Sequence, residues 1–184
     1  MLEYRQALAS DMQVIIDLHV LMSQSTYAHI LPRHYLHNEL PLEKQELWEQ
    51  RFAGPGGKQL IFLAIEAEKI AGFCCFLFNE EQEHGTYLHN LYVSPAYQRR
   101  GVAKSLLSQA IGAFDRERRE SPVHLLVFAE NTNAIATYEK LDGTVIEKRD
   151  VVRWGNPAVE VLRYQWPSAE VLRQRIDNPP GQKR

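Results

Sequence analysis

The segment from Leu88 to Leu107 constrains the fold of this chain most strongly. A short run with β-branched and aromatic residues ends at a Ser-Pro turn, a basic loop follows, and helix-forming residues begin after Gly101. This order predicts a β-strand that leads through a short loop into a helix. The first N–H groups of a helix have no intrahelical partners and lie at the positive end of the helix dipole. Such a junction can hold a phosphate group.

The residues of the loop are compatible with a bound phosphate. Gly101 has no Cβ and tolerates a positive φ, so an anion can approach the backbone closely. Ala103 is small, and Arg99, Arg100 and Lys104 surround the turn with positive charge. The loop lacks the spacing of a nucleotide-triphosphate loop and the three glycines of a dinucleotide fingerprint. An ordinary strand–helix connection with solvated arginines therefore stays open as an alternative.

The composition indicates one compact domain. The chain has 184 residues, of which 45% are hydrophobic, and a formal net charge of −2. The balanced charge gives no reason to expect a nucleic acid or a membrane as a partner. No apolar run approaches the roughly 20 residues that span a bilayer, and the N-terminal residues do not resemble a secretory signal. Cys74 and Cys75 are adjacent in an apolar run, which predicts buried free thiols and a cytoplasmic location.

Local patterns predict alternating strands and helices. Ser10 and Gln13 are expected to form a capping box for a first helix that reaches about Ser25, and Pro41 suits the first turn of a second helix. Residues 26–40 between them are expected to form a loop with a short helical piece. Two further helices are expected, one from the loop after Gly101 to about residue 119 and one at 132–141. The strands are expected at residues 2–8, 59–66, 69–79, 86–93, 123–128, 143–151 and 158–165.

The arrangement of these elements predicts an α/β fold. Antiparallel hairpins at both ends enclose one β-helix-β unit, which favours a single mixed sheet covered by helices. The domain is expected to span residues 1–166, and residues 167–184 are expected to form a loosely held C-terminal tail.

Two groups of residues resemble the GNAT superfamily of acyl-CoA-dependent N-acetyltransferases over about residues 1–165. Gln98-Arg99-Arg100-Gly101-Val102-Ala103 is similar to the family's Gln/Arg-x-x-Gly-x-Gly/Ala loop, and Leu91–Pro95 resembles the strand before it. Asn131, Ala134 and Tyr138, followed by Glu-Lys-Leu, resemble the family's downstream pattern. Ala103 stands where many members have glycine, and Asp142-Gly143 replaces the usual Gly-Phe.

The resemblance implies a twisted, mostly antiparallel sheet of six to seven strands and acetyl-CoA as the cofactor. In the family the loop binds the pyrophosphate, which here implies Gln98, Arg99, Arg100, Gly101, Val102, Ala103 and Lys104. The strand residues Leu91, Tyr92 and Val93 would offer backbone groups to the pantetheine arm, and Leu91 N–H would polarise the thioester carbonyl. Asn131 would hydrogen-bond the pantetheine arm.

The resemblance also implies the catalytic groups. Tyr138 is the candidate general acid that protonates the leaving thiolate, and it lies two helical turns after Asn131. His89 is the candidate general base, acting directly or through water, because imidazole titrates near neutrality. Strand alternation predicts that His89 shares a face with Tyr87, Leu91 and Val93. The alternative is a cleft-lining histidine that carries no proton.

The acceptor is expected to be a small-molecule or peptide amine. Weak candidates for acceptor contacts are Tyr27, His29, Ile30, Tyr35 and Tyr87. His34 and His37 have no metal-ligand pattern around them, so no metal site is expected. Dimers are common in the family, so a homodimer is a further expectation. A regulatory module that binds acyl-CoA with little turnover remains the alternative from another functional class.

Overall fold

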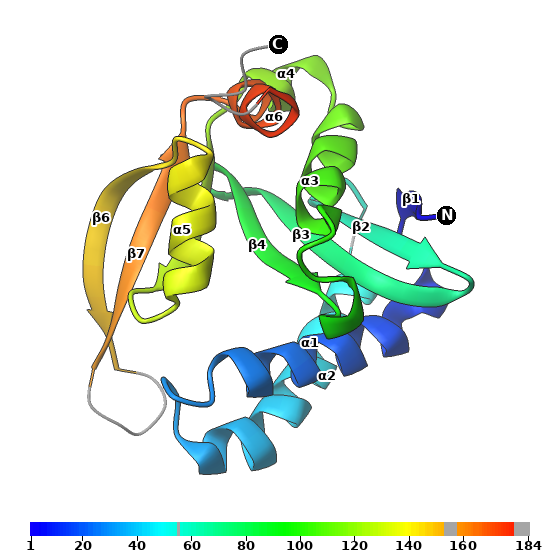
Figure 1. The fold of residues 1–184 in the computed structure, drawn as a ribbon, viewed down its shortest axis with the longest axis vertical. Coiled ribbons are helices and arrows are strands. Elements are labelled where there is room, and N and C mark those ends of the chain that lie inside the picture. The colour runs from blue at the N-terminus through cyan, green and yellow to red at the C-terminus, as the bar shows by residue number, and fades with distance from the viewer. Residues whose placement is uncertain (55, 153–157, 179–184) are drawn as a thin grey trace.

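The computed structural model describes residues 1–54, 56–152 and 158–178, and these form one mixed sheet with helices on both faces (Figure 1). The seven strands lie in the order β1-β2-β3-β4-β5-β7-β6. Only β4 and β5 run parallel, and every other neighbouring pair is antiparallel. The expected single, mostly antiparallel sheet is therefore confirmed. The strands are β1 (Glu3–Gln6), β2 (Gln59–Glu66), β3 (Lys69–Glu81), β4 (Gly85–Val93), β5 (Val123–Phe128), β6 (Thr144–Val151) and β7 (Val159–Trp166).

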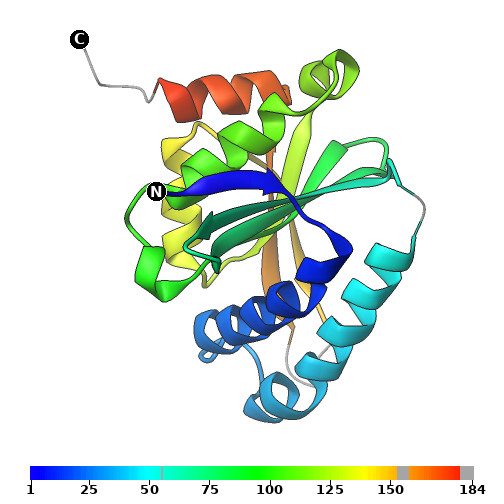
Figure 2. The same cartoon turned by 90° about the vertical axis from the view of Figure 1, so that its right-hand side faces the viewer.

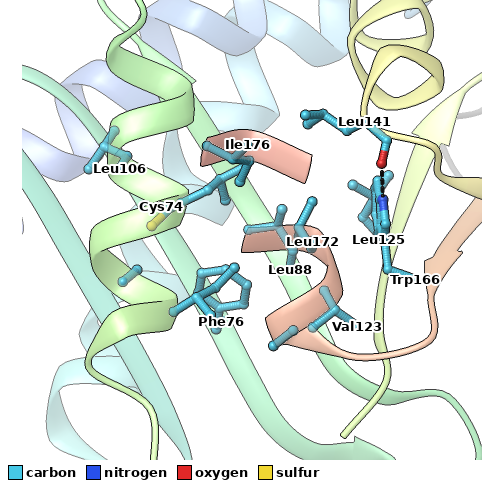
Figure 3. Close-up of a cluster of buried hydrophobic side chains, with 14 of the residues drawn as sticks. Cys74, Phe76, Leu88, Leu106, Val123, Leu125, Leu141, Trp166, Leu172 and Ile176 are labelled. Atoms are coloured by element: carbon cyan, nitrogen blue, oxygen red, sulfur yellow. Dashed lines mark hydrogen bonds between the residues drawn. The ribbon is translucent and has the colours of Figure 1, made fainter. Parts of the chain in front are cut away.

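The helices divide between the two faces of the sheet (Figure 2). On one face α1 and α2 pack over a core that includes Ile15, Trp48 and Phe73. On the other face α3 and α6 pack over a second core around Phe76, Leu106 and Leu172 (Figure 3). The α-helices are α1 (Met12–Thr26), α2 (Leu40–Ala53), α3 (Val102–Gly112), α4 (Arg116–Glu120), α5 (Thr132–Lys140) and α6 (Ala169–Asp177). Short 3₁₀ turns at η1 (Ala9–Asp11) and η3 (Pro95–Tyr97) and a π-helical segment, η2 (Tyr35–Glu39), connect them.

The sheet centre is apolar on both sides, because β3 consists largely of an uninterrupted apolar run. Residues 71–78 of this strand are buried throughout. The β2–β3 hairpin turns at Ala67 and Glu68, whose φ values of 48° and 64° match the left-handed conformation of a tight two-residue turn. The hairpin thus places β3 between β2 and β4, where helices cover both of its faces.

The start of the first helix differs from the prediction. Ser10 lies inside η1 and is not the N-cap of α1; Asp11 occupies that position, and its side chain binds the backbone at the start of η1. Its Oδ2 accepts a hydrogen bond from Leu8 N–H at 2.7 Å, and both of its carboxylate oxygens accept from the Arg5 guanidinium at 2.7 and 2.9 Å. A carboxylate that binds an arginine of the neighbouring strand was invisible to a local pattern.

The third helix is shorter than predicted. It ends at Gly112, and a new short helix, α4, begins after Asp115, whose Oδ1 accepts from Arg118 N–H at 2.8 Å. The break turns Phe114 into the core, where its ring meets Phe76 and Phe78 edge-on at 5.1 and 5.3 Å between centroids. Burial of this ring explains why one helix does not continue to residue 119.

The expectation of a loosely held tail is wrong for residues 169–177. These residues form α6, which Ser168 caps by accepting from Val171 N–H at 3.1 Å. Ala169, Leu172 and Ile176 recur at helical spacing and are buried against α3 and the sheet (Figure 3). Residues 179–184 lie outside the described residues.

The parallel strands β4 and β5 separate after a short contact. Among the described residues, their pairing consists of two residue pairs, Thr86 with Val123 and Tyr87 with His124. In β4 the register with β3 shifts so that Cys75 faces Asn90 and Phe76 faces Leu88, which leaves His89 as the extra residue of a β-bulge. The sheet therefore opens at its centre beyond Tyr87 and His124, and the bulge at His89 lies in the part of β4 that borders this opening. Within the described ranges, no helix has the length and apolar character required to cross a bilayer.

Candidate active site

A cleft of about 810 Å³ lies where β4 and β5 separate. The second half of β4, the end of β5 and the first turns of α5 form its walls, and Gln98 of the loop before α3 and Ala103 of the first turn of α3 border it. Residues of α1, α2 and the segment between them also line the cleft. The edge strand β6 contributes Arg149 and Val151. The opening thus connects the loop with the α1–α2 side of the molecule.

The loop before α3 leaves backbone groups accessible. Gly101 precedes the helix with φ +80°, and a Cβ at this position would meet no atom within 4 Å. No side chain caps the N-terminus of α3. Gln98 fastens the loop to β4, because its Nε2 donates to Val93 O at 3.1 Å. A helix N-terminus with open space in front of it fits a diphosphate.

The basic residues of the loop lie at the surface. Arg99 has φ 59°, and Arg99, Arg100 and Lys104 are exposed. The Arg100 guanidinium lies 3.8 Å from Glu66 and 5.1 Å from the centroid of the Tyr97 ring. The chain therefore carries three exposed basic side chains next to Gly101, while the side chain of Val102 is buried.

The structure gathers most of the sequence-predicted cofactor residues around this opening. Those that line the cleft are Leu91, Tyr92, Val93, Gln98, Ala103, Asn131 and Tyr138. Gly101 and the basic residues stand beside the cleft at the helix terminus. Asn131 caps α5 by accepting from Ala134 N–H through Oδ1 at 3.4 Å. That bond orients the side-chain amide, which can serve a cofactor through the donors of its NH₂ group and through the second lone pair of its oxygen.

Tyr138 lies on the α5 wall of the cleft. Its ring packs against Tyr164 and Trp166, with centroids 5.8 and 6.1 Å away. Burial, and to a smaller extent the nearby Tyr92, raise the pKa of its phenol well above the ordinary value. The phenol is therefore protonated at neutral pH and can act as a proton donor.

Tyr27 and Tyr92, predicted separately as site residues, meet on the α1 side of the cleft. The hydroxyl of Tyr92 lies 3.2 Å from that of Tyr27 and 3.4 Å from Ser23 Oγ. Burial raises the pKa values of both phenols, so both are neutral. The sequence motif pointed to the backbone of Tyr92, and nothing in it signalled that its side chain joins α1 to the cleft.

His89 does not share a face with Leu91 and Val93, because the bulge interrupts the alternation. Leu91 and Val93 pack toward the α3 core, whereas Tyr87 packs toward the α1–α2 core. His89 contacts Tyr87, with ring centroids 5.0 Å apart, and lines the cleft. The alternation prediction is therefore correct for Tyr87 and wrong beyond the bulge.

Four of the five acceptor candidates line the cleft. These are Tyr27, His29, Tyr35 and Tyr87, while Ile30 packs against the small cluster of Leu31, Tyr35, Leu36 and Leu40. Tyr87 stacks on His124 with ring planes 9° apart, and burial raises the pKa of its phenol to about 12. Tyr35 donates through its hydroxyl to Glu43 Oε2 at 2.7 Å.

Several residues that line the cleft were not predicted from the sequence. His19, Glu43, Lys44 and Arg149 come from α1, α2 and β6 and carry no motif. His19 is buried, and its Nδ1 accepts from Trp48 Nε1–H at 3.0 Å. Burial lowers the pKa of His19 well below the ordinary value, and the charges of Lys44 and Arg51 add to the effect. This imidazole is therefore neutral.

Comparison with known proteins agrees with this architecture. Residues 24–143 match the sequence profile of the acetyltransferase (GNAT) family. An uncharacterised N-acetyltransferase of Methanocaldococcus jannaschii is 29% identical over 97 residues, which cover 53% of this chain and 38% of that protein. The L-amino acid N-acetyltransferase of Escherichia coli is 26% identical over 114 residues, which cover 61% of this chain and 70% of that protein.

Solved structures share the fold. The PaiA N-acetyltransferase from Thermoplasma acidophilum, in complex with coenzyme A, superposes with a TM-score of 0.69 at 17% sequence identity. The superposition covers 90% of this chain and 99% of the PaiA chain. Spermidine N-acetyltransferase from Vibrio cholerae, in complex with CoA and spermine, superposes with a TM-score of 0.65 at 18% sequence identity. That superposition covers 93% of this chain and 98% of the spermidine N-acetyltransferase chain. The sequence match extends over more than half of the chain and includes the loop at Gly101, β5 and α5. The chain therefore belongs to the acetyltransferase (GNAT) family.

Proposed function

We propose that this chain is an N-acetyltransferase that transfers acetyl from acetyl-CoA to a primary amine. The observation that carries the proposal is the open N-terminus of α3 at Gly101, beside a cleft between separating strands. Family membership and the coenzyme A in the related PaiA structure support the choice of cofactor.

The proposed cofactor contacts follow from the geometry of the cleft. The backbone N–H groups from Arg99 to Lys104 would hold the pyrophosphate, with the basic side chains around it. The pairing of β4 with β5 ends at Tyr87. The backbone groups of Leu91 to Val93 would therefore hydrogen-bond an extended pantetheine arm in the place of a neighbouring strand. When bound, acetyl-CoA would supply an activated thioester with a thiolate leaving group.

Two side chains are proposed to move protons. A lysine-like amine with a pKa near 10.4 is neutral only about one time in 2,500 at pH 7, so a base that removes its proton contributes to the rate. His89 lines the cleft and is the proposed base, directly or through water. Tyr138 is protonated and is the proposed acid for the thiolate, while Leu91 N–H is proposed to stabilise the oxyanion.

Direct attack by the amine is preferred over an acyl-cysteine route. Cys74 and Cys75 are both wholly buried in β3. Burial raises the pKa of the Cys75 thiol to about 11 and that of Cys74 still higher, so neither is a nucleophilic thiolate at neutral pH.

The acceptor is proposed to be a small-molecule or peptide amine that enters from the α1–α2 side. The related proteins named above act on L-amino acids and on spermidine, which differ in charge. A plant relative of 17% identity was crystallised with a bisubstrate analogue. The acceptor panel therefore needs α-amino acids, a polyamine, an arylalkylamine and a peptide with a free N-terminus.

The test is an assay of the purified chain with acetyl-CoA and this panel. Thiol release measured against each amine, with the acetylated product identified by mass spectrometry, is expected for at least one acceptor. Initial rates against both substrates are expected to give intersecting double-reciprocal lines, as a ternary complex requires. Tight acetyl-CoA binding in calorimetry without product from any amine would instead support a regulatory acyl-CoA-binding module.

A further inference from the structure

Asn90, next to His89 on β4, carries two contacts at a single oxygen. Arg51 Nη1 of α2 donates to Asn90 Oδ1 at 2.9 Å, and His89 Nδ1 lies 3.0 Å from the same oxygen. Asn90 is only 4% exposed and faces Cys75 of β3 across the strands. Solvent therefore competes little with these hydrogen bonds.

The chemistry of the three groups determines where the imidazole proton lies. A guanidinium can only donate, so Arg51 fixes the amide of Asn90 with its oxygen, not its nitrogen, at this point. A carbonyl oxygen can only accept, so His89 Nδ1 must be the donor to it. In a neutral imidazole with a proton on Nδ1, Nε2 carries the basic lone pair.

Arg51 is itself held in place. Its guanidinium carbon lies 4.8 Å from the centroid of the Trp48 ring, and Trp48 is fully buried. Gln59 Nε2 donates to the backbone oxygen of Arg51 at 2.7 Å, which ties the end of α2 to β2. The position of the guanidinium is thus set by the core and not by the cleft.

We propose that Arg51 and Asn90 are positioning residues that hold His89 in the Nδ1–H tautomer, so that Nε2 takes the proton of the acceptor amine. The tautomer is a property of the protein alone, and only the use of Nε2 rests on the proposed function. When Nε2 takes one proton from the ammonium group, the ring becomes an imidazolium that still donates from Nδ1 to Asn90 Oδ1. The neutral amine then forms the N–C bond, the C–S bond breaks with its electron pair on sulfur, and Tyr138 protonates the thiolate. The second proton, which the nitrogen loses as it becomes an amide, returns to the Tyr138 phenolate.

The charged and titratable neighbours of His89 come from several elements. His19 of α1 lies within electrostatic range, as does Arg51 of α2, and Tyr87 of β4 contacts the ring. His19 and Tyr87 are neutral near pH 7, because burial lowers the pKa of His19 and raises that of Tyr87 to about 12. Asn90→Asp would place a carboxylate directly beside His89 Nδ1.

The tautomer is tested directly by ¹⁵N NMR of the intact chain labelled at histidine. In the unliganded protein, at a pH where the His89 ring is neutral, the ¹⁵N chemical shift of Nδ1 is expected to be that of a protonated nitrogen. The shift of Nε2 is expected to be that of an unprotonated nitrogen. Arg51→Met keeps the aliphatic stem over Trp48 but removes the donor, and it is expected to shift the ring toward the Nε2–H tautomer. The finding of Nε2–H as the major form in the unaltered protein would overturn the proposal, whether or not the chain acetylates any amine.

Kinetics test the consequence for catalysis. Arg51→Met is expected to lower kcat about 10- to 100-fold with KM for acetyl-CoA unchanged, since a misplaced proton removes most of a general base's contribution. Arg51→Lys restores a donor and is expected to recover part of the rate. Asn90→Asp is expected to move the acidic limb of kcat/KM to higher pH, because a carboxylate favours the imidazolium.

Arg118→Met provides the matched control. The Arg118 guanidinium also lies over an aromatic ring, 4.0 Å from the centroid of Phe78, but Arg118 is not among the residues that line the cleft, so this variant is expected to leave the pH profile and the ¹⁵N pattern unchanged. If the folded Arg51→Met protein kept both the wild-type tautomer and the wild-type kcat, Arg51 would have no positioning role.

Discussion

Tyr138 shows how one side chain acquires its chemistry from its surroundings. A tyrosine in solution is already protonated at pH 7, and burial beside Tyr164 and Trp166 raises its pKa further. A weaker acid gives up its proton less readily, yet a thiolate with a pKa near 8.5 in solution still needs a donor nearby when it departs in a closed cleft. Position at the cleft wall, and not acidity, is what qualifies Tyr138.

Tyr138→Phe is expected to lower kcat about 100-fold while KM for acetyl-CoA changes little, because only the proton donor is lost. Steady-state kinetics with the best acceptor measure both constants. Tyr164→Phe is the control, since it deletes the same hydroxyl from the adjacent ring outside the cleft. Equal kcat values in the Tyr138 and Tyr164 variants would remove Tyr138 from the mechanism.

Among the elements, α3 carries the proposed phosphate site and depends on its neighbours for its position. Its buried face packs on the sheet through Leu106 and on α6 through the core around Leu172. Its N-terminus is exposed at Gly101, where the chain adopts a left-handed conformation. The helix therefore has one end that serves a ligand and a face that serves stability, and the two can be perturbed separately.

Gly101→Ala is expected to raise KM for acetyl-CoA about 10-fold, equivalent to about 1.4 kcal/mol, because its Cβ would occupy the open space before the helix. It should also destabilise the fold by about 1–2 kcal/mol, because a left-handed φ disfavours alanine. Gly57→Ala separates the two effects: with φ +88° and the same open surroundings it carries the strain, but it lies outside the cleft lining. An unchanged KM in the Gly101 variant would argue against the phosphate site.

Leu172→Ala tests the contribution of α6. Leu172 is fully buried, so the truncation is expected to cost about 2–5 kcal/mol in the free energy of unfolding. Urea denaturation measures this value. Gln174→Ala, on the exposed side of the same helix, is expected to stay within about 0.5 kcal/mol of the parent protein. A loss below about 1 kcal/mol for Leu172→Ala would mean that α6 adds little to the core.

The whole molecule contains a buried polar cluster behind the cleft. Arg163 pairs with Glu81 at 2.7 Å and Glu147 at 2.6 Å, and its Nη1 donates to His124 Nδ1 at 2.8 Å. Burial, aided by the charge of Arg163, lowers the pKa of His124 to about 4. His124 is thus neutral in the folded protein, whereas in the unfolded chain it titrates near 6.5.

The free energy of unfolding is therefore expected to decrease as the pH is lowered from about 6.5 to about 4. In this window the unfolded chain binds a proton that the folded state does not, so protonation favours unfolding. From pH 7 to pH 5, His124 alone should account for a loss of about 2 kcal/mol. The carboxyl groups of Asp11 and Glu147 have lowered pKa values, so their stabilisation is lost only at more acidic pH.

His124→Asn keeps an acceptor for Arg163 but does not titrate, so it is expected to flatten the pH dependence of unfolding between pH 5 and 7. Urea denaturation at several pH values measures the slope. His34→Asn, at a residue whose side chain is 74% exposed, should leave the slope unchanged. A slope as steep in the His124 variant as in the parent protein would show that other groups control the acid sensitivity.

The sequence alone determined the features that depend on neighbours in the chain. Apolar runs, turn residues and two spaced motifs predicted the strands, the loop at Gly101, α5 and the family, because these patterns reflect local conformation and direct backbone contacts. The same local reasoning failed where a distant partner decided the outcome. Asp11 binds the guanidinium of Arg5 in β1, and the ring of Phe114 packs in the core where a longer helix was predicted. The apolar spacing of residues 169–177 corresponds to a buried helix face only because α3 and the sheet pack against it.

Only the tertiary structure decided how the cleft is built. The bulge at His89 depends on the register between β3 and β4, and it reverses the faces that alternation assigned to Leu91 and Val93. Contacts such as Arg51 to Asn90 join residues 39 positions apart. A single sequence carries no record of such pairings, because hydrogen bonds and burial between distant segments exist only once the chain has folded.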